Sequence, residues 1–280
     1  MIRTRVLVGT VLALAAGGIL VGDDHLAAGY FPCLFVCLMA LGVIAGRELV
    51  ALFPAPIRPS ECLVVTGTSL CVAANWFPVA FGYGSVWPLV VFTLAGTVIA
   101  AMLLEMYRYT GEPGVVVPRL GTTMFAVAYI GVLSCFFVQV RFLPREHTAW
   151  LLALTIFVPK CNDIGAFFTG TFFGKHKMTP LLSPKKTWEG LAGGFLAGVA
   201  VAVGVGSYVP VFPRGAVEAV AFGLVVGLAG VLGDLAESLV KRDCQMKDAA
   251  KSIPGFGGLL DVVDAVLFAA PVAYLWFCWV

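Results

Sequence analysis

The feature that most constrains this chain is a run of 43 residues, from Cys62 to Leu104, without a charged side chain. One membrane-spanning helix needs about 20 apolar residues, so this run is too long for one span and should fold back on itself. Apolar runs of spanning length recur along the chain, in which 60% of residues are hydrophobic and 12% are charged. Soluble domains carry roughly twice that share of charge. The sequence therefore predicts an all-α, polytopic membrane protein.

Short polar or proline-rich segments divide the apolar runs into about nine expected transmembrane helices. The long uncharged run should turn where Asn75–Pro78 and Gly82–Gly84 interrupt it. The first apolar run, Val6–Gly22, also has the composition of a signal peptide, but we favour a retained helix because the rest of the chain needs a membrane. The expected spans are residues 6–22, 26–46, two within 62–104, 120–140, 148–168, 191–209, 216–239 and 259–280.

The distribution of basic residues predicts how the chain lies across the membrane. With the N-terminus inside, fourteen Lys and Arg residues lie on the inner side, and Arg141, Arg145 and Arg214 lie on the outer side. Cytoplasmic loops carry such an excess of positive charge. We therefore expect a multi-pass protein of the cell (inner) membrane, with its N-terminus in the cytoplasm and its C-terminus on the outer side. Its N-terminal membrane region should cover residues 1–140, and a C-terminal region, residues 141–280, carries the polar motifs.

The most polar segment, Leu232–Val266, contains ten of the chain's 18 basic and 16 acidic residues. On a helix, Asp234, Ser238 and Lys241 recur at i, i+4 and i+7 and share one face. Asp234 lies inside an apolar stretch, where an ionised carboxylate is costly. A solvated loop between two membrane helices would not explain that carboxylate, so the segment indicates a functional site.

A glycine-rich turn, Ile253–Gly258, follows the helix that Arg242 ends. Asp261 and Asp264 then stand at i and i+3 at the start of the next helix. Acidic side chains suit a hard cation, and basic side chains suit phosphate groups. The pattern therefore brings both kinds of group together across the turn.

Polar residues also occur at membrane depth in the expected span 148–168. Lys160, Asn162 and Asp163 lie there, and such residues mark a functional interior by default. The alternative is a Lys160–Asp163 pair at i and i+3 that serves packing only.

The largest hydrophilic loop before the main motif, residues 169–189, contains the basic block S-P-K-K-T. A basic loop beside a membrane binds anionic lipid head groups in many proteins, and that reading stays open beside a role in binding substrate phosphate. Ser183 or Thr187 could cap the helix that follows.

The segment from Ser238 to Asp264 resembles the signature of the phosphatidate cytidylyltransferases, also known as CDP-diacylglycerol synthases. That pattern reads S-x-apolar-K-R, four residues, K-D, then I-P-G-H-G-G and apolar-x-D-R-apolar-D. The residues in register are Ser238, Lys241, Arg242, Lys247, Asp248, Pro254, Gly257, Gly258, Asp261 and Asp264. The chain departs from the pattern at two positions, where Phe256 replaces the usual His and Val262 replaces the usual Arg.

Two further hallmarks of that family are matched by the segments Ser183–Gly190 and Asn162–Phe167, the latter followed by Gly170. The resemblance implies transfer of the CMP moiety of CTP to phosphatidate, which gives CDP-diacylglycerol and pyrophosphate for phospholipid biosynthesis. It also implies a polar, cytoplasm-facing cavity formed by the C-terminal half. Its partners would be CTP, phosphatidate and membrane lipid, with no nucleic acid, and a homodimer is left open.

The chemistry of that reaction fits these residue types. The phosphate of the lipid is already an anionic nucleophile, so the main task is to bring two polyanions together and to stabilise the departing pyrophosphate. Divalent metal and basic side chains do this, without a Ser-His-Asp triad. We expect Mg²⁺ as the cofactor, and a second ion is left open.

The resemblance and the residue types together assign the roles in the site. The expected metal ligands are Asp234, Asp261 and Asp248. The expected catalytic residues are Lys241, Arg242, Asp261, Asp264 and Lys185. The expected substrate-binding residues are Asn162, Asp163, Ser183, Lys186, Ser238, Lys247, Gly257 and Gly258.

Two other functions compete with this interpretation. A CTP-dependent lipid kinase, such as a polyprenol or phytol kinase, would use similar groups but release CDP instead of pyrophosphate. An anion transporter would explain polar residues at membrane depth, but it predicts inverted repeats, which we do not find. The eight cysteines have no C-x-x-C spacing, so a zinc site or a disulfide framework is not expected.

Overall fold

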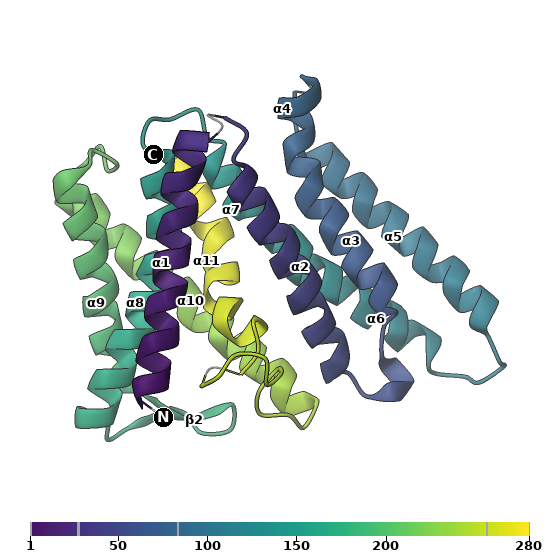
Figure 1. Cartoon of the computed structure of the whole chain (residues 1–280). Helices are drawn as coiled ribbons and strands as arrows, with labels where there is room; N and C mark the ends of the chain where they lie inside the picture. Colours follow the sequence, from purple (N-terminus) through teal and green to yellow (C-terminus); the bar gives the residue numbers. More distant parts are fainter. Residues whose placement is uncertain (1, 27–28, 83, 256, 280) are drawn as a thin grey trace. The chain divides into compact units, whose positions relative to one another are not determined.

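The computed structural model describes residues 2–26, 29–82, 84–255 and 257–279, with side chains from residue 8 onward. Phe256, one of the two departures from the family pattern, lies outside the described residues. The chain is helical, with a small two-stranded sheet (Figure 1). The elements are α1 (Ile2–Leu26), α2 (Pro32–Leu52), η1 (Ala55–Ile57), α3 (Glu61–Ala73), η2 (Ala74–Trp76), α4 (Phe77–Phe81), α5 (Trp87–Arg108), α6 (Val116–Ala126), η3 (Val127–Val132), α7 (Leu133–Arg141), α8 (Thr148–Phe173), β1 (Lys177–Thr179), β2 (Ser183–Thr187), α9 (Trp188–Tyr208), α10 (Ala216–Asp243) and α11 (Leu260–Trp279).

Eight helical stretches in the described part of the chain are long and apolar enough to cross a membrane. They are Pro32–Leu52, Glu61–Phe81, Trp87–Arg108, Val116–Arg141, Thr148–Phe173, Trp188–Tyr208, Ala216–Asp243 and Leu260–Trp279. The prediction of an all-α, polytopic membrane protein is confirmed. The first expected span falls within α1, which is not among these eight stretches, so the count of nine stays a prediction.

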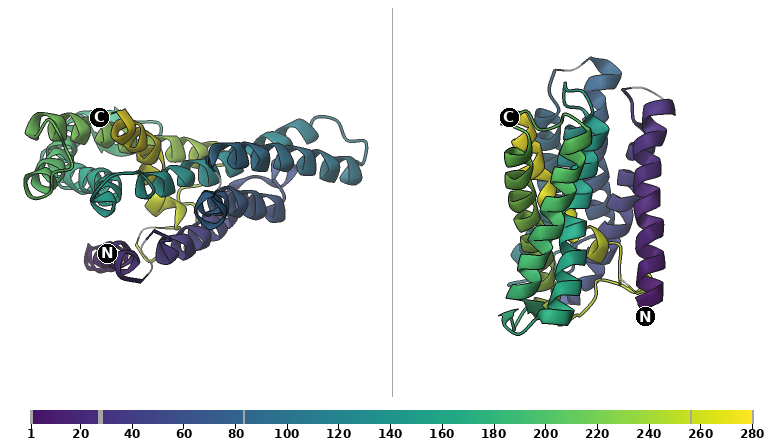
Figure 2. Two further views of the ribbon diagram at one scale, coloured as in Figure 1. Left: turned by 90° about the horizontal axis from the view of Figure 1, so that it is seen from above. Right: turned by 90° about the vertical axis from the view of Figure 1, so that its left-hand side faces the viewer.

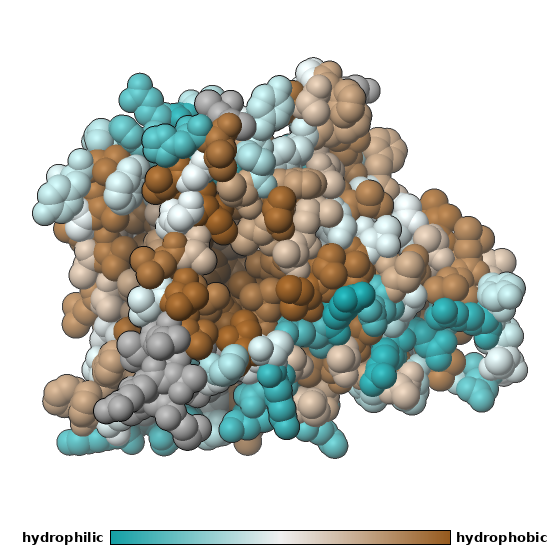
Figure 3. Space-filling view, in the orientation of Figure 1, coloured by the Kyte–Doolittle hydropathy of each residue, from teal (hydrophilic) through white to brown (hydrophobic). Residues whose placement is uncertain are grey.

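Apolar side chains cover much of the surface of these helices, and hydrophilic side chains gather toward helix ends (Figure 3). On α5, for example, Phe92, Leu103 and Met106 are all exposed. Exposed apolar residues in such numbers are unfavourable in water and suit contact with lipid tails.

The turn within the long uncharged run begins at Gly82, in the second of the two segments that the sequence suggested, and not in the first. The expected turn at Asn75–Pro78 is wrong, because η2 and α4 continue the helical path through these residues. The Asn75 side chain donates to the carbonyls of Cys71 and Val72, at 3.0 Å each, and Pro78 lies in the first turn of α4, where it needs no N–H. The helix ends at Gly82, whose φ of 71° closes it.

The first compact unit comprises residues 1–138 and 248–260. Helix α3 lies at its centre and packs against α2, α5 and the π-helical segment η3. Glycines permit the close approach, because a Cβ on Gly131 would lie 3.1 Å from the backbone of Thr68. The buried core of this unit includes Val64, Cys71 and Val127.

The second compact unit comprises residues 139–247 and 261–280, and α8, α9, α10 and α11 are its main helices (Figure 2). Small residues let α8 approach both α9 and α10. A Cβ on Gly194 of α9 would lie 2.1 Å from Asn162 Oδ1, and one on Gly230 of α10 would lie 2.6 Å from Pro159 Cβ. No larger residue fits at either glycine without movement of α8.

The hydrophilic loop before α9 forms a hairpin, which the sequence did not predict. Strands β1 and β2 are antiparallel, with Lys177 opposite Thr187 and Thr179 opposite Ser183. Thr187 ends the hairpin and caps α9, because its Oγ1 accepts the N–H of Gly190 at 3.1 Å. The expected cap at this position is therefore confirmed for Thr187.

Candidate active site

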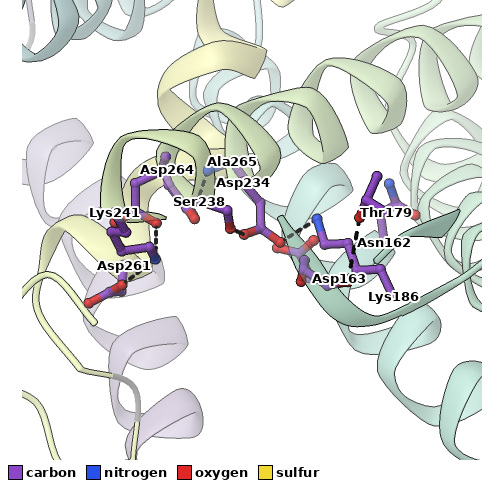
Figure 4. A network of polar contacts seen from close by, with 12 residues as sticks. Asn162, Asp163, Thr179, Lys186, Asp234, Ser238, Lys241, Asp261, Asp264 and Ala265 are labelled. Carbon is purple, nitrogen blue, oxygen red and sulfur yellow. Dashed lines mark hydrogen bonds and ion pairs between the residues drawn. The ribbon is translucent and has the colours of Figure 1, made fainter. Parts of the chain in front are cut away.

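The polar residues of the second unit converge at one end of its helices. The C-terminal part of α10, the first turns of α11, the hairpin and α8 all contribute side chains to one network (Figure 4). Arg242, near the end of α10, donates from Nε to the carbonyl of Leu182 in the hairpin at 3.3 Å. The motifs that stood apart in the sequence are therefore adjacent in this unit.

Three carboxylates form the acidic centre of this network. Asp234, Glu237 and Asp264 each place an oxygen within 4.8 Å of the others. Asp234 and Glu237 lie at i and i+3 on α10, and Asp264 comes from α11. Glu237 is only 1% exposed and Asp264 only 4%. Like charges in so buried a place repel strongly unless cations compensate them.

Three lysines from three different elements alternate with the carboxylates. Lys241 Nζ of α10 lies 2.5 Å from Glu237 Oε2 and 2.6 Å from Asp261 Oδ1. Lys186 Nζ of β2 lies 2.5 Å from Asp234 Oδ2, and Figure 4 shows the two side chains pointing toward each other.

The third lysine, Lys160 of α8, lies 3.7 Å from Asp163 Oδ2 and 3.9 Å from Asp264 Oδ1. The local Lys160–Asp163 pair, which the sequence offered as the alternative that serves packing only, is thus one part of a wider network. Five carboxylates face three ammonium groups, so two negative charges remain uncompensated when all are ionised.

These residues fit a divalent cation. Glu237 Oε1 is buried and has no hydrogen-bond partner among the described residues, although Oε2 is bound to Lys241. A buried carboxylate oxygen without a donor is costly, and a bound cation would satisfy it. A site made only of oxygen ligands with a small number of carboxylates suits Mg²⁺. The excess negative charge of the network also favours a bound cation.

The sequence missed two members of this network. Glu237 stands three residues after Asp234 and four before Lys241, so its spacing on α10 already placed it on the same helix face. Lys160 was considered only as the partner of Asp163, and its second contact, with Asp264, joins segments 104 residues apart in the sequence.

The expected metal ligands lie in different surroundings. Asp234 is a member of the acidic centre, whereas Asp261 is bound to Lys241. Asp248 is exposed and belongs to the first unit. The structure groups Asp234 with Glu237 and Asp264 instead, so the ligand set expected from the sequence stays a prediction.

The other expected site residues of the second unit, which include Lys185 from the catalytic set, differ in how far they are buried. Ser238 is buried and its Oγ lies 3.4 Å from Asp234 Oδ1, within the network. Lys185 and Lys247 are exposed, and Ser183 is half-buried at the start of β2. Asn162 is buried on α8, and its Nδ2 donates to the carbonyl of Gly227 on α10 at 2.8 Å.

The glycine-rich turn belongs to the first unit, where it is held by Glu48 of α2. Gly257 has a φ of 112°, a conformation that side-chain-bearing residues rarely adopt, and forms a bridge with Ile253. Gly258 is buried. The roles expected for these two glycines in substrate binding stay predictions.

Comparison with known proteins identifies relatives over the full length of the chain. The family model described as "Cytidylyltransferase family" matches residues 3–279. A phosphatidate cytidylyltransferase of Mycobacterium bovis is 29% identical over 290 residues, which cover 98% of this chain and 87% of the relative. The chloroplastic phosphatidate cytidylyltransferase 5 of Arabidopsis thaliana is 30% identical over 97% of this chain and 71% of its own length. The phosphatidate cytidylyltransferase of Bacillus subtilis is 32% identical over 62% of this chain and 64% of its own length.

Proposed function

This chain belongs to the cytidylyltransferase family, and on that premise we propose that it transfers the CMP moiety of CTP to phosphatidate, giving CDP-diacylglycerol and pyrophosphate. Relatives named for that reaction cover nearly the whole chain. The single observation that carries the proposal is the partly buried network of five carboxylates and three lysines beside a basic hairpin. Such a network suits a metal ion and the phosphate groups of two polyanionic substrates.

The reaction needs no covalent enzyme intermediate and little acid–base help. A phosphate oxygen of phosphatidate, already anionic, forms a new bond to the α-phosphorus of CTP. The bond between that phosphorus and the oxygen bridging to the β-phosphate breaks, and its electron pair leaves with pyrophosphate. The residues of the site therefore have to position the two substrates and to stabilise negative charge.

We assign Asp234, Glu237 and Asp264 as the residues that would hold Mg²⁺. The ion would neutralise phosphate charge and orient the reacting groups. Asp261, which the sequence also suggested as a ligand, remains a candidate for a second ion, and the role of Asp248 rests on the family resemblance alone. The choice of the first three is supported by Glu237 Oε1, which is buried and has no hydrogen-bond partner among the residues that the structure describes.

The basic residues divide into buried and exposed groups with different tasks. Lys241 is held between Glu237 and Asp261, so its ammonium group has a fixed position toward the reacting phosphates. Lys186, on the hairpin, would exchange its bond to Asp234 for phosphate oxygens as substrate binds. Arg242 and Lys185 are exposed and would contact the outer phosphates, Arg242 in bidentate fashion.

The remaining predicted residues complete the substrate site. Ser183 and Ser238 would donate hydrogen bonds to phosphate oxygens, and Lys247 would add positive charge. The family resemblance also assigns Gly257 and Gly258 to substrate binding. Asn162 and Asp163 would form the floor of a polar cavity, while the tails of phosphatidate remain in the bilayer.

The same reasoning gives the placement in the membrane. We propose that residues 141–280 carry catalysis, that residues 1–140 form a supporting membrane region, and that the chain lies in the cell (inner) membrane. Basic residues concentrate at the hairpin end of the second unit, and the loop before α10, with Arg214, lies at the other end. The positive-inside rule then puts the hairpin and the N-terminus in the cytoplasm and the C-terminus on the outer side.

The test uses purified protein in lipid or detergent, with phosphatidate, Mg²⁺ and labelled CTP. We expect release of pyrophosphate together with formation of the liponucleotide, and loss of both products when Mg²⁺ is chelated. Release of CDP without pyrophosphate would instead show a lipid kinase. No turnover by protein with a cooperative unfolding transition would refute the proposal.

A further inference from the structure

Outside the acidic network, another buried carboxylate binds the segment 252–260, which lies within the region that resembles the family signature. Glu48, near the end of α2, is 8% exposed and lies in a tightly packed stretch in which Ala45 and Leu49 are almost fully buried. Its Oε1 accepts the hydroxyl of Ser252 at 2.5 Å, and its Oε2 accepts the backbone N–H of Leu260 at 2.8 Å. One carboxylate thus binds both ends of the segment 252–260, which lies more than 200 residues later in the sequence.

Gly258 shows how closely the segment is fitted to this carboxylate. A Cβ at this position would lie 2.5 Å from Glu48 Oε2 and 2.8 Å from Glu48 Cδ. Real Cβ atoms do not approach other atoms that closely, so any side chain at position 258 would displace Glu48 or the segment. The φ of Gly258 is not in the left-handed region, and the requirement for glycine therefore comes from the place that Glu48 occupies.

The segment between the two anchored ends is closed by its own backbone. Ile253 and Gly257 exchange two N–H to carbonyl hydrogen bonds, of 2.7 and 3.0 Å. Leu260, which Glu48 binds, is the first residue of α11, and Asp261 follows directly. A carboxylate that accepts the N–H of the first helical residue also suits the positive end of the helix dipole. Glu48 therefore fixes where α11 begins.

We propose that Glu48 is a positioning residue for the transfer reaction, because it sets the start of the helix that delivers Asp261 and Asp264. The proposal rests on the proposed function, since those two aspartates matter only if the network binds metal and phosphate. Asp261 holds Lys241, and Asp264 belongs to the acidic centre. A small displacement of the start of α11 would move both, and misplacement by about 1 Å can lower a rate on the order of 100-fold.

The experiment compares Glu48→Ala with Glu48→Gln and with the control Glu61→Ala. Glu61 is an exposed acid of the first unit whose partner, Arg47, is exposed as well. We expect Glu48→Ala to lower kcat about 10- to 100-fold with little change in the KM for CTP, the pattern of a lost transition-state interaction. Glutamine can accept from Leu260 and donate to Ser252, so Glu48→Gln should stay within about fivefold of wild type. Glu61→Ala should match wild type.

A second measurement follows the segment itself. Hydrogen exchange of backbone amides in residues 253–262 should become faster in Glu48→Ala and stay unchanged in Glu61→Ala. Ser252→Ala removes one of the two hydrogen bonds without removing the carboxylate, and it should give a smaller change of the same kind. This variant keeps the test open if Glu48→Ala does not fold.

Gly258→Ala provides an independent check through coupling. Its effect on kcat should be large in wild type and smaller in the Glu48→Ala background, because the group it collides with is then absent. Additive effects of the two substitutions on kcat would contradict a close contact between position 258 and Glu48.

The two proposals fail in different ways. If wild-type protein does not turn over CTP and phosphatidate, the proposed function is refuted, while the exchange measurements still test whether Glu48 holds the segment. If wild type is active and Glu48→Ala has the kcat and the exchange rates of Glu61→Ala, the positioning role is refuted and the proposed function stands.

Discussion

Glu48 and Glu237 are both buried glutamates, one in each compact unit, and their hydrogen bonding differs. Both oxygens of Glu48 accept hydrogen bonds, from a hydroxyl and from a backbone N–H at the start of a helix. One oxygen of Glu237 is bound to Lys241, the other has no hydrogen-bond partner in the described part of the chain, and two further carboxylates lie beside it. A buried acid whose bonds are complete can serve as an anchor. A buried acid whose bonds are incomplete is arranged for a ligand that binds later.

The two glutamates therefore have different roles. The first unit supplies a carboxylate that binds backbone and a hydroxyl group, and the second unit supplies three adjacent carboxylates, which we propose as the ligands of a cation. The same substitution at the two positions should therefore have different effects on stability and on activity. Functional sites in proteins commonly retain such unfavourable arrangements because the ligand relieves them.

The largest effect is expected from Glu237→Gln, which makes at Glu237 the same change as Glu48→Gln. Loss of a metal ligand should lower kcat by about 1,000-fold, since a bound metal contributes several kcal/mol to stabilising phosphate charge. Removal of one of three adjacent negative charges should leave the midpoint of thermal unfolding unchanged or higher. Pyrophosphate release and a thermal melt with and without Mg²⁺ measure both quantities. A Glu237→Gln enzyme as active as Glu48→Gln would erase the distinction between the two glutamates.

Asp261→Asn should have the next largest effect. It distinguishes the proposed metal ligands of the second unit from the residue that orients Lys241. We expect activity to fall at least about 100-fold, because Lys241 loses one of its two carboxylate partners and its fixed position. A titration of activity against Mg²⁺ separates the two roles considered for Asp261. An unchanged Mg²⁺ requirement in the residual activity would identify Asp261 as the group that orients Lys241, and a raised requirement would identify it as a ligand. Full activity of this variant would contradict both roles.

Much of the fold was predictable because apolar length alone determines a membrane helix. The start of α8 at Thr148 and that of α10 at Ala216 agree with the sequence analysis, and α11 begins within one residue of the expected position. The turn at Asn75–Pro78 was misplaced because proline and asparagine favour turns in general, whereas here Pro78 occupies a first helical turn. The hairpin was missed because its strands are three and five residues long and contain almost no apolar pattern.

The candidate site was predictable only as far as spacing along one element allows. Asp234, Ser238 and Lys241 could be placed on one face of a helix, and Asp261 and Asp264 at the start of the next. The contacts of Lys186 with Asp234 and of Lys160 with Asp264 join different elements, and no local pattern encodes them. Glu48 was out of reach for the same reason, since its partners lie more than 200 residues away in the sequence.

Lys186→Met should have a moderate effect and tests whether the hairpin contributes charge to the site. Lys186 is the only one of the three network lysines that comes from the hairpin, and its bond to Asp234 is available for exchange with phosphate. We expect the KM for CTP to rise about tenfold with a smaller change in kcat, the pattern of lost ground-state binding. Lys175→Met is the matched control, because Lys175 precedes β1 and its side chain is exposed. Equal KM values for the two variants would contradict a role of Lys186 in nucleotide binding.

The smallest effect is expected from Thr187→Ala. This substitution tests whether the second unit also contains a buried side chain whose role is to hold backbone in place. Thr187 is 4% exposed, and its hydroxyl caps α9 through the N–H of Gly190. Loss of an N-cap lowers stability by about 1 kcal/mol, so the unfolding midpoint should fall while kcat stays within about threefold of wild type. Thr187→Ser, which keeps the cap, should restore the midpoint. The reverse result, with kcat reduced and the unfolding midpoint unchanged, would show that Thr187 acts in the reaction, as proposed for Glu237. Thr187 would then not share the structural role proposed for Glu48.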